Sequence, residues 1–119
     1  VSDFRVKSPE KKKLKKSQGK RSLELVPTKD VLAYMGRNKK NQFLVGFALE
    51  TDNELENAKI KLKEKNLNAI VLNSLNDKGA GFSSNTNKIS YIKKNELVKK
   101  FPLQSKLECA KSIFEQILS

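Results

Sequence analysis

The stretch that decides the fold is residues 42–72, QFLVGFALETDNELENAKIKLKEKNLNAIVL. It begins with a near-continuous apolar run of strand length, residues 42–50, which is rich in β-branched and aromatic side chains. It ends with a second, shorter apolar run, residues 69–72. A run without polar alternation is typical of a parallel strand that is buried on both faces, and residues 42–50 are predicted to be one.

The segment between the two runs has the pattern of an amphipathic helix. Thr51 and Glu54 have the spacing of a capping box, which predicts a helix that begins there. Its apolar positions fall on one face: Leu55, Ala58 and Leu62. Strand, helix and strand in this order predict a βαβ unit with a parallel sheet.

The flanking segments extend this pattern on both sides. Upstream, residues 22–27 read as a short strand that Pro27 closes. Thr28 then caps a helix that Gly36 is expected to stop. The apolar positions of that helix are Val31, Leu32 and Met35.

Downstream, the chain predicts a hairpin and a final helix. Residues 88–92 and 97–103 flank residues 93–96 as the two strands, and Ser105 is the expected N-cap. The helix has one apolar face: Leu107, Ala110, Ile113, Phe114 and Ile117. The whole pattern predicts an α/β fold: a partial, Rossmann-like, mainly parallel sheet with flanking helices and a C-terminal β-hairpin plus helix.

The charge of the chain is concentrated at its start. The 119 residues carry a formal net charge of +12, and residues 1–21 contribute +7 of it through nine cationic and two anionic side chains. Residues 5–21 are cation-rich and aperiodic, and we expect a flexible flap there. Such a run suits phosphate-bearing partners of any kind.

Other counts exclude several kinds of site. The chain has no histidine and one cysteine, which excludes His-based acid–base or zinc chemistry, cysteine-cluster metal sites and intramolecular disulfides. No apolar run approaches the roughly 18 residues of a membrane span, and no signal peptide is visible. These features predict a cytoplasmic protein with no membrane contact.

Three features have both a structural and a functional interpretation. The cluster KKKLKK, Lys11–Lys16, is either a solvated charge run or a flap that closes over phosphates. Lys61 and Lys65 lie one helical turn apart, either as ordinary surface lysines or as a phosphate-binding ridge. Phe47 is either a core residue or a platform for a base, with Gly46 allowing a close approach of the backbone.

Two further features favour the structural interpretation. The glycine-containing segment GAGFSSNTN, residues 79–87, matches neither phosphate-loop fingerprint and is predicted to be a loop. Cys109 borders the apolar face of the last helix, where a small buried hydrophobe is expected rather than a reactive thiol.

Seven motifs in order resemble the C-terminal part of bacterial phosphopantothenoylcysteine synthetase, over essentially the whole chain. They are VSDFR, KLKK, LELVPTKDVLAYMG, LVGFALET, ENAKIKLKEKNLNAIVLN, GFSSNTN and PLQSKLECAKSIFEQIL. The resemblance implies a ligase of coenzyme A biosynthesis that joins 4′-phosphopantothenate to cysteine. It implies CTP as co-substrate with Mg²⁺, and an acyl-cytidylate intermediate.

The resemblance assigns site residues in the first part of the chain. Asp3 would contact the ribose or base region of the nucleotide, and Lys13 would be the catalytic flap lysine that reaches the triphosphate. The segment Lys29, Asp30, Val31 and Leu32 would meet the nucleotide partly through backbone groups. Lys29 replaces a proline of the family pattern, which leaves the local geometry of that segment open.

It also assigns residues in the second part. Phe47 would contact the nucleotide, and Lys61 and Lys65 would bind its phosphates. Side chains that the family pattern has as Ala or Asp are replaced here by Leu72, Ser74 and Asn85. No metal ligand is predicted among the protein side chains.

The resemblance covers only part of the family's domain, so residues 1–119 are predicted to be its C-terminal portion. The glycine-rich first turn and the asparagine that acts on the acyl-cytidylate precede this portion in the family. We therefore expect this chain alone to be inactive. A homodimer is implied, with a fused or associated flavin-dependent decarboxylase.

Two alternatives to the ligase remain. One is a basic nucleic-acid-binding module, which the charge suggests. The basic run has no interleaved aromatics and no recognition-helix pattern, so no nucleic-acid partner is expected. The other is a non-catalytic fragment that serves only for dimerisation.

Overall fold

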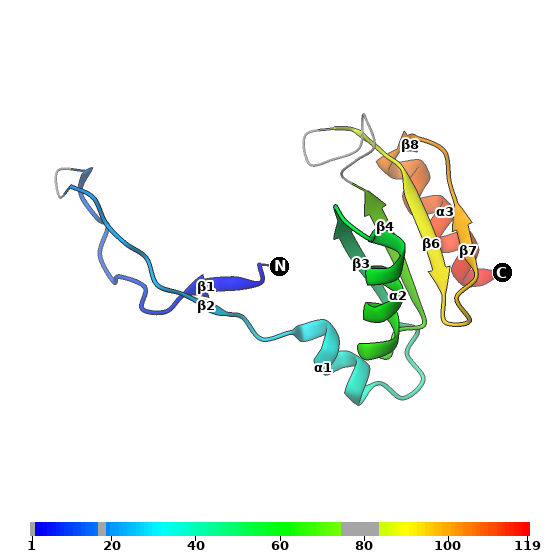
Figure 1. The fold of residues 1–119 in the computed structure, drawn as a ribbon, viewed down its shortest axis with the longest axis horizontal. Helices are drawn as coiled ribbons and strands as arrows, with labels where there is room; N and C mark the ends of the chain where they lie inside the picture. Colours follow the sequence, from blue (N-terminus) through cyan, green and yellow to red (C-terminus); the bar gives the residue numbers. More distant parts are fainter. Residues whose placement is uncertain (1, 17–18, 75–83) are drawn as a thin grey trace. The chain divides into compact units, whose positions relative to one another are not determined.

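The computed structural model describes residues 2–16, 19–74 and 84–119 (Figure 1). The chain divides into two compact units, Val1–Val31 and Leu32–Ser119, which are considered separately. The predicted residues Gly79, Gly81 and Ser83 lie outside the described ranges.

The first unit is an antiparallel ribbon of two short strands, β1 (Phe4–Val6) and β2 (Leu25–Pro27) (Figure 1). Phe4 is opposite Pro27 in this register. The pairing continues past the strand ends, because the Thr28 amide donates to the carbonyl of Asp3 at 2.8 Å. The predicted flap, residues 5–21, therefore begins inside β1, and its described residues 7–16 and 19–21 belong to the arm between the two strands.

The second unit is built on a four-stranded mixed sheet of order β3-β4-β6-β7. Its strands are β3 (Val45–Glu50), β4 (Ala69–Ser74), β6 (Ile89–Lys93) and β7 (Val98–Lys100). β3 and β4 are parallel and are joined through the helix α2 (Glu54–Glu64), which confirms the predicted βαβ unit. β6 pairs antiparallel with β4 and with β7, which confirms the predicted hairpin.

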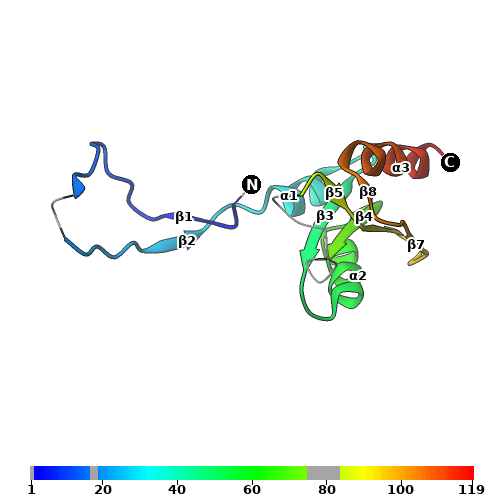
Figure 2. The same cartoon turned by 90° about the horizontal axis from the view of Figure 1, so that it is seen from above.

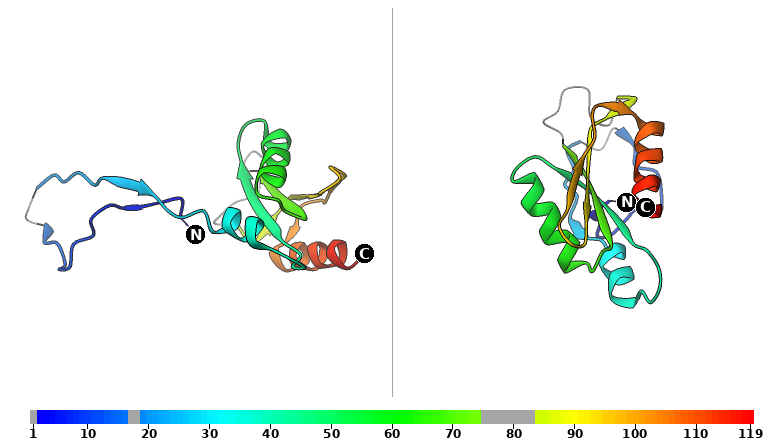
Figure 3. Two further views of the ribbon diagram at one scale, coloured as in Figure 1. Left: turned by 90° about the horizontal axis from the view of Figure 1, so that it is seen from below. Right: turned by 90° about the vertical axis from the view of Figure 1, so that its right-hand side faces the viewer.

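Helices cover both faces of this sheet. α2 lies on one face, and α3 (Lys106–Leu118) lies on the other (Figures 2 and 3). A third helix, α1 (Val31–Asn38), precedes β3, and the short strands β5 (Thr86–Asn87) and β8 (Gln104–Ser105) pair antiparallel beside α3. This arrangement confirms the predicted α/β class.

Each face of the sheet has its own core. The core under α2 contains Leu44, Ala48, Ala58, Leu62, Leu67, Ile70, Leu72 and Ile92. The core under α3 contains Ala69, Val71, Ile89, Tyr91 and Cys109, with Ile113 and Ile117 packed against it. Cys109 is thus a small buried hydrophobe, as predicted. Leu107 and Phe114, which were expected on the buried face of the last helix, are 67% and 63% exposed because α3 turns its Cys109–Ile113–Ile117 line to the sheet.

The prediction that residues 42–50 are buried on both faces is wrong for the described structure. β3 is an edge strand of the described sheet, and only its Gly46 and Ala48 face is fully covered. On the other face Phe47 is 71% exposed and Leu49 is 39% exposed. The reason is the position of α3, which packs against β5, β6 and β8. It therefore does not cover Phe47 and Leu49 on β3.

The predicted N-cap at Ser105 and the predicted capping box at Thr51 differ in outcome. At α3 the N-cap is confirmed, and it is part of a capping box: Ser105 Oγ accepts from the Glu108 amide, and the Glu108 carboxylate accepts from the Ser105 amide. These hydrogen bonds lower the pKa of Glu108 below its ordinary value. At α2 the box predicted from Thr51 is absent, because Asn53 is the N-cap, with φ 42°, and makes no side-chain cap bond.

Gly36 does not stop α1, which continues to Asn38. Its actual role is close packing against the end of α2. A Cβ atom at this position would lie 1.8 Å from the carbonyl oxygen of Lys65, and the Gly36 carbonyl accepts a hydrogen bond from Asn66 Nδ2 at 3.0 Å. Only glycine lets these two backbones approach so closely.

Gly36→Ala is therefore expected to destabilise the protein. On an open helix surface alanine would stabilise by up to about 1 kcal/mol through its higher helix propensity. Here the clash with backbone dominates, and overpacking of this kind costs about 1–3 kcal/mol. Thermal unfolding measures the difference, with the exposed Arg37→Ala as the control on the same helix. A higher midpoint for Gly36→Ala would contradict the packing seen here.

Candidate functional site

The nine site residues predicted from the sequence are divided between the two units. Five lie in the first unit: Asp3, Lys13, Lys29, Asp30 and Val31. Four lie in the second: Leu32, Phe47, Lys61 and Lys65. The positions of these residues are therefore described within each unit separately.

In the first unit the ribbon brings Asp3 next to the segment that begins at Lys29. The Asp3 carbonyl accepts from the Thr28 amide, and Thr28 Oγ1 donates to the Ser2 carbonyl at 2.6 Å. Lys13 lies away from this junction along the chain, in the arm between β1 and β2, and its side chain is exposed. The backbone pairing thus joins two of the predicted contact segments and leaves Lys13 at a separate position.

In the second unit Phe47 is exposed on β3, whereas Leu32 packs against the core under α2. Gly46, the residue before Phe47, allows Leu32 to pack there. A Cβ at Gly46 would lie 2.6 Å from Leu67 Cδ1 and 3.1 Å from Leu32 Cδ2. The glycine therefore admits two leucine side chains, and its neighbour Phe47 presents its ring to the opposite side of the strand.

Lys61 is held at the carboxyl end of β3 by an ion pair with Glu50. The Glu50 side chain is only 12% exposed, while that of Lys61 is 42% exposed. Lys65 follows one turn later, at the C-cap of α2, where its amide donates to the Lys61 carbonyl at 3.1 Å. The predicted pair of lysines thus lies on one flank of α2, with Lys61 anchored by a nearly buried carboxylate.

The other flank of α2 has a separate charge cluster. Lys59 and Lys63 both pair with Glu96, the former at 3.4 Å. The hydrogen bond and the charge of Lys63, with further help from Lys59, lower the pKa of Glu96, and Glu96 in turn raises the pKa of Lys63. Both of these lysines are thus engaged by an exposed surface carboxylate.

Two residues of this region were missed by reasoning from the sequence. Glu50 is the last residue of β3, and the signal available in the sequence was a single carboxylate at the end of the apolar run LVGFALE. Asn73, opposite Leu49 in the register, faces the same side of the sheet as Phe47. Its Oδ1 atom is buried and has no hydrogen-bond partner among the residues that the structure describes, which is uncommon for a buried polar atom.

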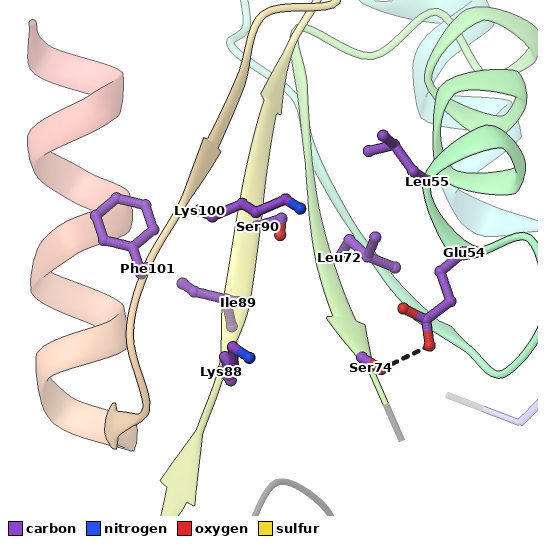
Figure 4. A pocket seen from close by; sticks show the side chains of 9 residues that line it. All are labelled: Glu54, Leu55, Leu72, Ser74, Lys88, Ile89, Ser90, Lys100 and Phe101. Carbon is purple, nitrogen blue, oxygen red and sulfur yellow. Dashed lines mark hydrogen bonds between the residues drawn. The ribbon is translucent and has the colours of Figure 1, made fainter. Parts of the chain in front are cut away.

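A cavity of about 340 Å³ lies at the carboxyl end of β4, in the same unit. Figure 4 shows its lining, which comes from α2, β4 and the β6–β7 hairpin. The lining residues are Glu54, Leu55, Leu72, Ser74, Lys88, Ile89, Ser90, Lys100 and Phe101. None of the nine predicted residues is among them.

Metal and membrane features were also assessed. Within residues 2–16, 19–74 and 84–119, no three His, Cys, Asp or Glu side chains are grouped so that they could hold a metal ion. None of the described helices has both the length and the hydropathy needed to cross a bilayer.

Comparison with known proteins identifies the family. The model of the DNA/pantothenate metabolism flavoprotein C-terminal domain matches residues 1–119. This chain belongs to that family. The finding confirms the family resemblance inferred from the seven sequence motifs.

Individual relatives agree with this assignment. The chain is 50% identical over 120 residues to a cysteine/cysteine sulfinic acid decarboxylase from an unknown prokaryotic organism, covering 100% of the chain and 33% of that protein. It is 40% identical over 117 residues to the coenzyme A biosynthesis bifunctional protein CoaBC of Bacillus subtilis, covering 98% of the chain and 29% of that protein. The chain thus spans about a third of the length of these curated relatives.

Solved structures give the same fold. The C-terminal domain of a CoaBC protein superposes with a TM-score of 0.67 at 42% identity, over 79% of this chain and 45% of that one. A DNA/pantothenate metabolism flavoprotein from Streptococcus pneumoniae has a TM-score of 0.68 over 89% of this chain and 45% of that one. At 21% identity, the second match supports the fold alone.

The unequal burial of the two ion-pair clusters leads to a stability prediction. Lys61→Met removes the partner of a carboxylate that is 12% exposed, and a nearly buried unpaired charge costs about 1–3 kcal/mol. Lys63→Met is the matched control, since it removes a lysine from the same helix that pairs with exposed Glu96. Chemical denaturation should show a clear loss for Lys61→Met and little change for Lys63→Met. Equal losses would mean that Glu50 is not a buried anchor.

Proposed function

We propose that this chain supplies one side of the CTP site of a phosphopantothenate–cysteine ligase that acts in coenzyme A biosynthesis. The observation that carries the proposal is the position of Lys61, fixed by Glu50 at the carboxyl end of β3 and one turn from Lys65. Ligands of open α/β sheets bind at the carboxyl ends of the parallel strands. Membership of the family and the name of the CoaBC relatives support the pathway.

The proposed reaction has two steps. The carboxylate of 4′-phosphopantothenate attacks the α-phosphate of CTP, forming an acyl-cytidylate and releasing pyrophosphate. The amine of cysteine then attacks the acyl carbon, forming the amide and releasing CMP. Mg²⁺ enters as part of the nucleotide substrate and neutralises phosphate charge. The task of the protein is therefore positioning and charge stabilisation, which needs no histidine.

Each site residue has a proposed part in this task. Lys61 and Lys65 offer ammonium groups to the phosphates, and Lys13 closes the flap over the acyl-nucleotide. Phe47 provides an exposed aromatic ring for the nucleotide, on the face of the sheet where a buried oxygen of Asn73 has no partner within the described part of the chain. Asp3 and the segment Lys29–Leu32 approach the ribose and base, partly through backbone groups.

We propose that the remaining residues of the active site lie outside these 119 residues. Because the chain spans about a third of its curated relatives, we propose that it is inactive alone and completes a larger active site. The decarboxylase name of one relative and the flavoprotein name of the family support a parent protein that is fused to, or works with, a flavin-dependent decarboxylase. We place the parent protein in the cytoplasm.

Dimerisation is the second candidate function. In the described sheet β3 pairs only with β4, so one of its edges is available for another strand. An open strand edge favours association with further chain, from the same protein or from a second copy. This observation supports the expected homodimer and is compatible with the ligase role.

Calorimetric titration with Mg²⁺-CTP tests the proposal. The full-length protein should bind CTP more tightly than UTP. Lys65→Met should weaken CTP binding by about tenfold, because a charge-assisted contact with phosphate is worth about 1.4 kcal/mol or more. Lys63→Met on the opposite flank of α2 should leave the affinity unchanged.

Three results would count against the proposed site. They are equal affinity for CTP and UTP, no binding by the folded protein, or equal effects of Lys65→Met and Lys63→Met. Titration of the 119-residue chain alone should show only weak binding and no product. Tight oligonucleotide binding that falls steeply with salt would instead support the nucleic-acid alternative.

A further inference from the structure

The cavity at the carboxyl end of β4 has opposite charges on facing walls. α2 contributes a carboxylate, Glu54, and the β6–β7 hairpin and the residue before it contribute two ammonium groups, Lys100 and Lys88. Its volume is about 340 Å³. A cavity that attracted only phosphate would not place a carboxylate on its wall, because like charges repel.

A hydrogen bond fixes the carboxylate of the acidic wall. Glu54 is the first residue of α2, and its carboxylate accepts a hydrogen bond of 2.5 Å from Ser74 Oγ (Figure 4). Ser74, the last residue of β4, is only 8% exposed. A carboxylate has about four acceptor positions, and the Ser74 hydroxyl, which uses one of them, orients Glu54 on this wall.

The basic wall faces the same space from the hairpin. Lys100 is opposite Ser90 in the β6–β7 register, and its side chain reaches across β6 toward Leu72 (Figure 4). Lys100 takes part in no ion pair with any residue of the described ranges. Lys88 precedes β6 and lines the cavity near Ser74. Two ammonium groups on one wall suit a carboxylate of the ligand.

An apolar surface separates the two walls. Leu55 and Leu72 line the cavity between Glu54 and the lysines. A carboxylate, two ammonium groups and a short apolar surface together complement a molecule that has an ammonium, a carboxylate and a small side chain. An α-amino acid has these three features.

We propose that this cavity binds the amino-acid substrate, L-cysteine, with its ammonium beside Glu54 and its carboxylate beside Lys88 and Lys100. The inference rests on the proposed ligase function, which requires such a substrate. The cavity lies at the carboxyl edge of the parallel pair, the same edge where Glu50 fixes Lys61. The thiol lies against Leu55 and Leu72, which carry no group that would exchange with it.

Steady-state kinetics of the full-length protein test this site. Glu54→Gln and Lys100→Met should each raise the KM for cysteine by about tenfold, since each removes one charged contact. Pyrophosphate release from CTP and 4′-phosphopantothenate in the absence of cysteine should stay at the wild-type rate. Lys99→Met is the matched control, because it removes the same charge from the neighbouring position of β7, where side chains alternate between the two faces, and Lys99 does not line the cavity.

Cysteamine, which lacks the carboxylate of cysteine, distinguishes the role of Glu54 from the role of Lys100. It should be a poorer substrate than cysteine for the wild type. Lys100→Met should leave the KM for cysteamine unchanged, whereas Glu54→Gln should raise it, because only the ammonium contact remains. If Lys100→Met raises the KM for both amines equally, the proposed orientation is wrong.

Failure of this inference can be told from failure of the proposed function. Wild-type pyrophosphate release with unchanged cysteine KM in both variants overturns the amino-acid site and leaves the ligase intact. No pyrophosphate release by the wild type overturns the ligase proposal. In that case, NMR titration of the wild type with cysteine decides the site: saturable shifts of the Ser74 and Ser90 amides support it, and their absence overturns it.

Discussion

The parallel pairing of β3 with β4 is the constraint on which the second unit depends. Two parallel strands cannot be joined by a tight turn, so the chain must cross back along the sheet, and α2 makes that crossing. The crossing buries Ala58 and Leu62 against the sheet and leaves charged residues on both flanks of the helix. It also brings the ends of both strands, Glu50 and Ser74, to one edge. The ion pair of Lys61 with Glu50 and the cavity beside Ser74 lie at that edge.

Local patterns were enough to predict most elements of the fold. The apolar run at residues 69–72, the helical spacing around Ala58 and the N-cap at Ser105 are properties of neighbouring residues, and the structure confirms each of them. Contacts between distant segments could not be predicted in this way. The continuation of α1 through Gly36 depends on the carbonyl of Lys65, and the exposure of Phe47 depends on where α3 lies. Neither partner is visible in the sequence near the residue concerned.

The same limit applies to the sites. Family motifs predicted Lys61 and Lys65 as site residues, but the carboxylate that anchors Lys61 belongs to another element, 11 positions earlier in the chain. The cavity at the end of β4 is lined from α2, β4 and the β6–β7 hairpin, so no contiguous motif describes it. Its residues include Ser74, which replaces an aspartate of the family pattern and orients Glu54 through its hydroxyl. A departure from the motif thus acquires a physical role only when its neighbours are known.

The ion pair between Glu50 and Lys61 also has a consequence for the entropy of binding. A free lysine loses about 2 kcal/mol of rotamer entropy when it is immobilised. Because Glu50 already restricts Lys61, much of that loss occurs during folding and not when a ligand arrives. An ammonium group has three hydrogens, so it can keep its bond to Glu50 and still donate to an incoming oxygen. The carboxylate thus lowers the net positive charge near the lysine but holds its remaining donors in a fixed direction.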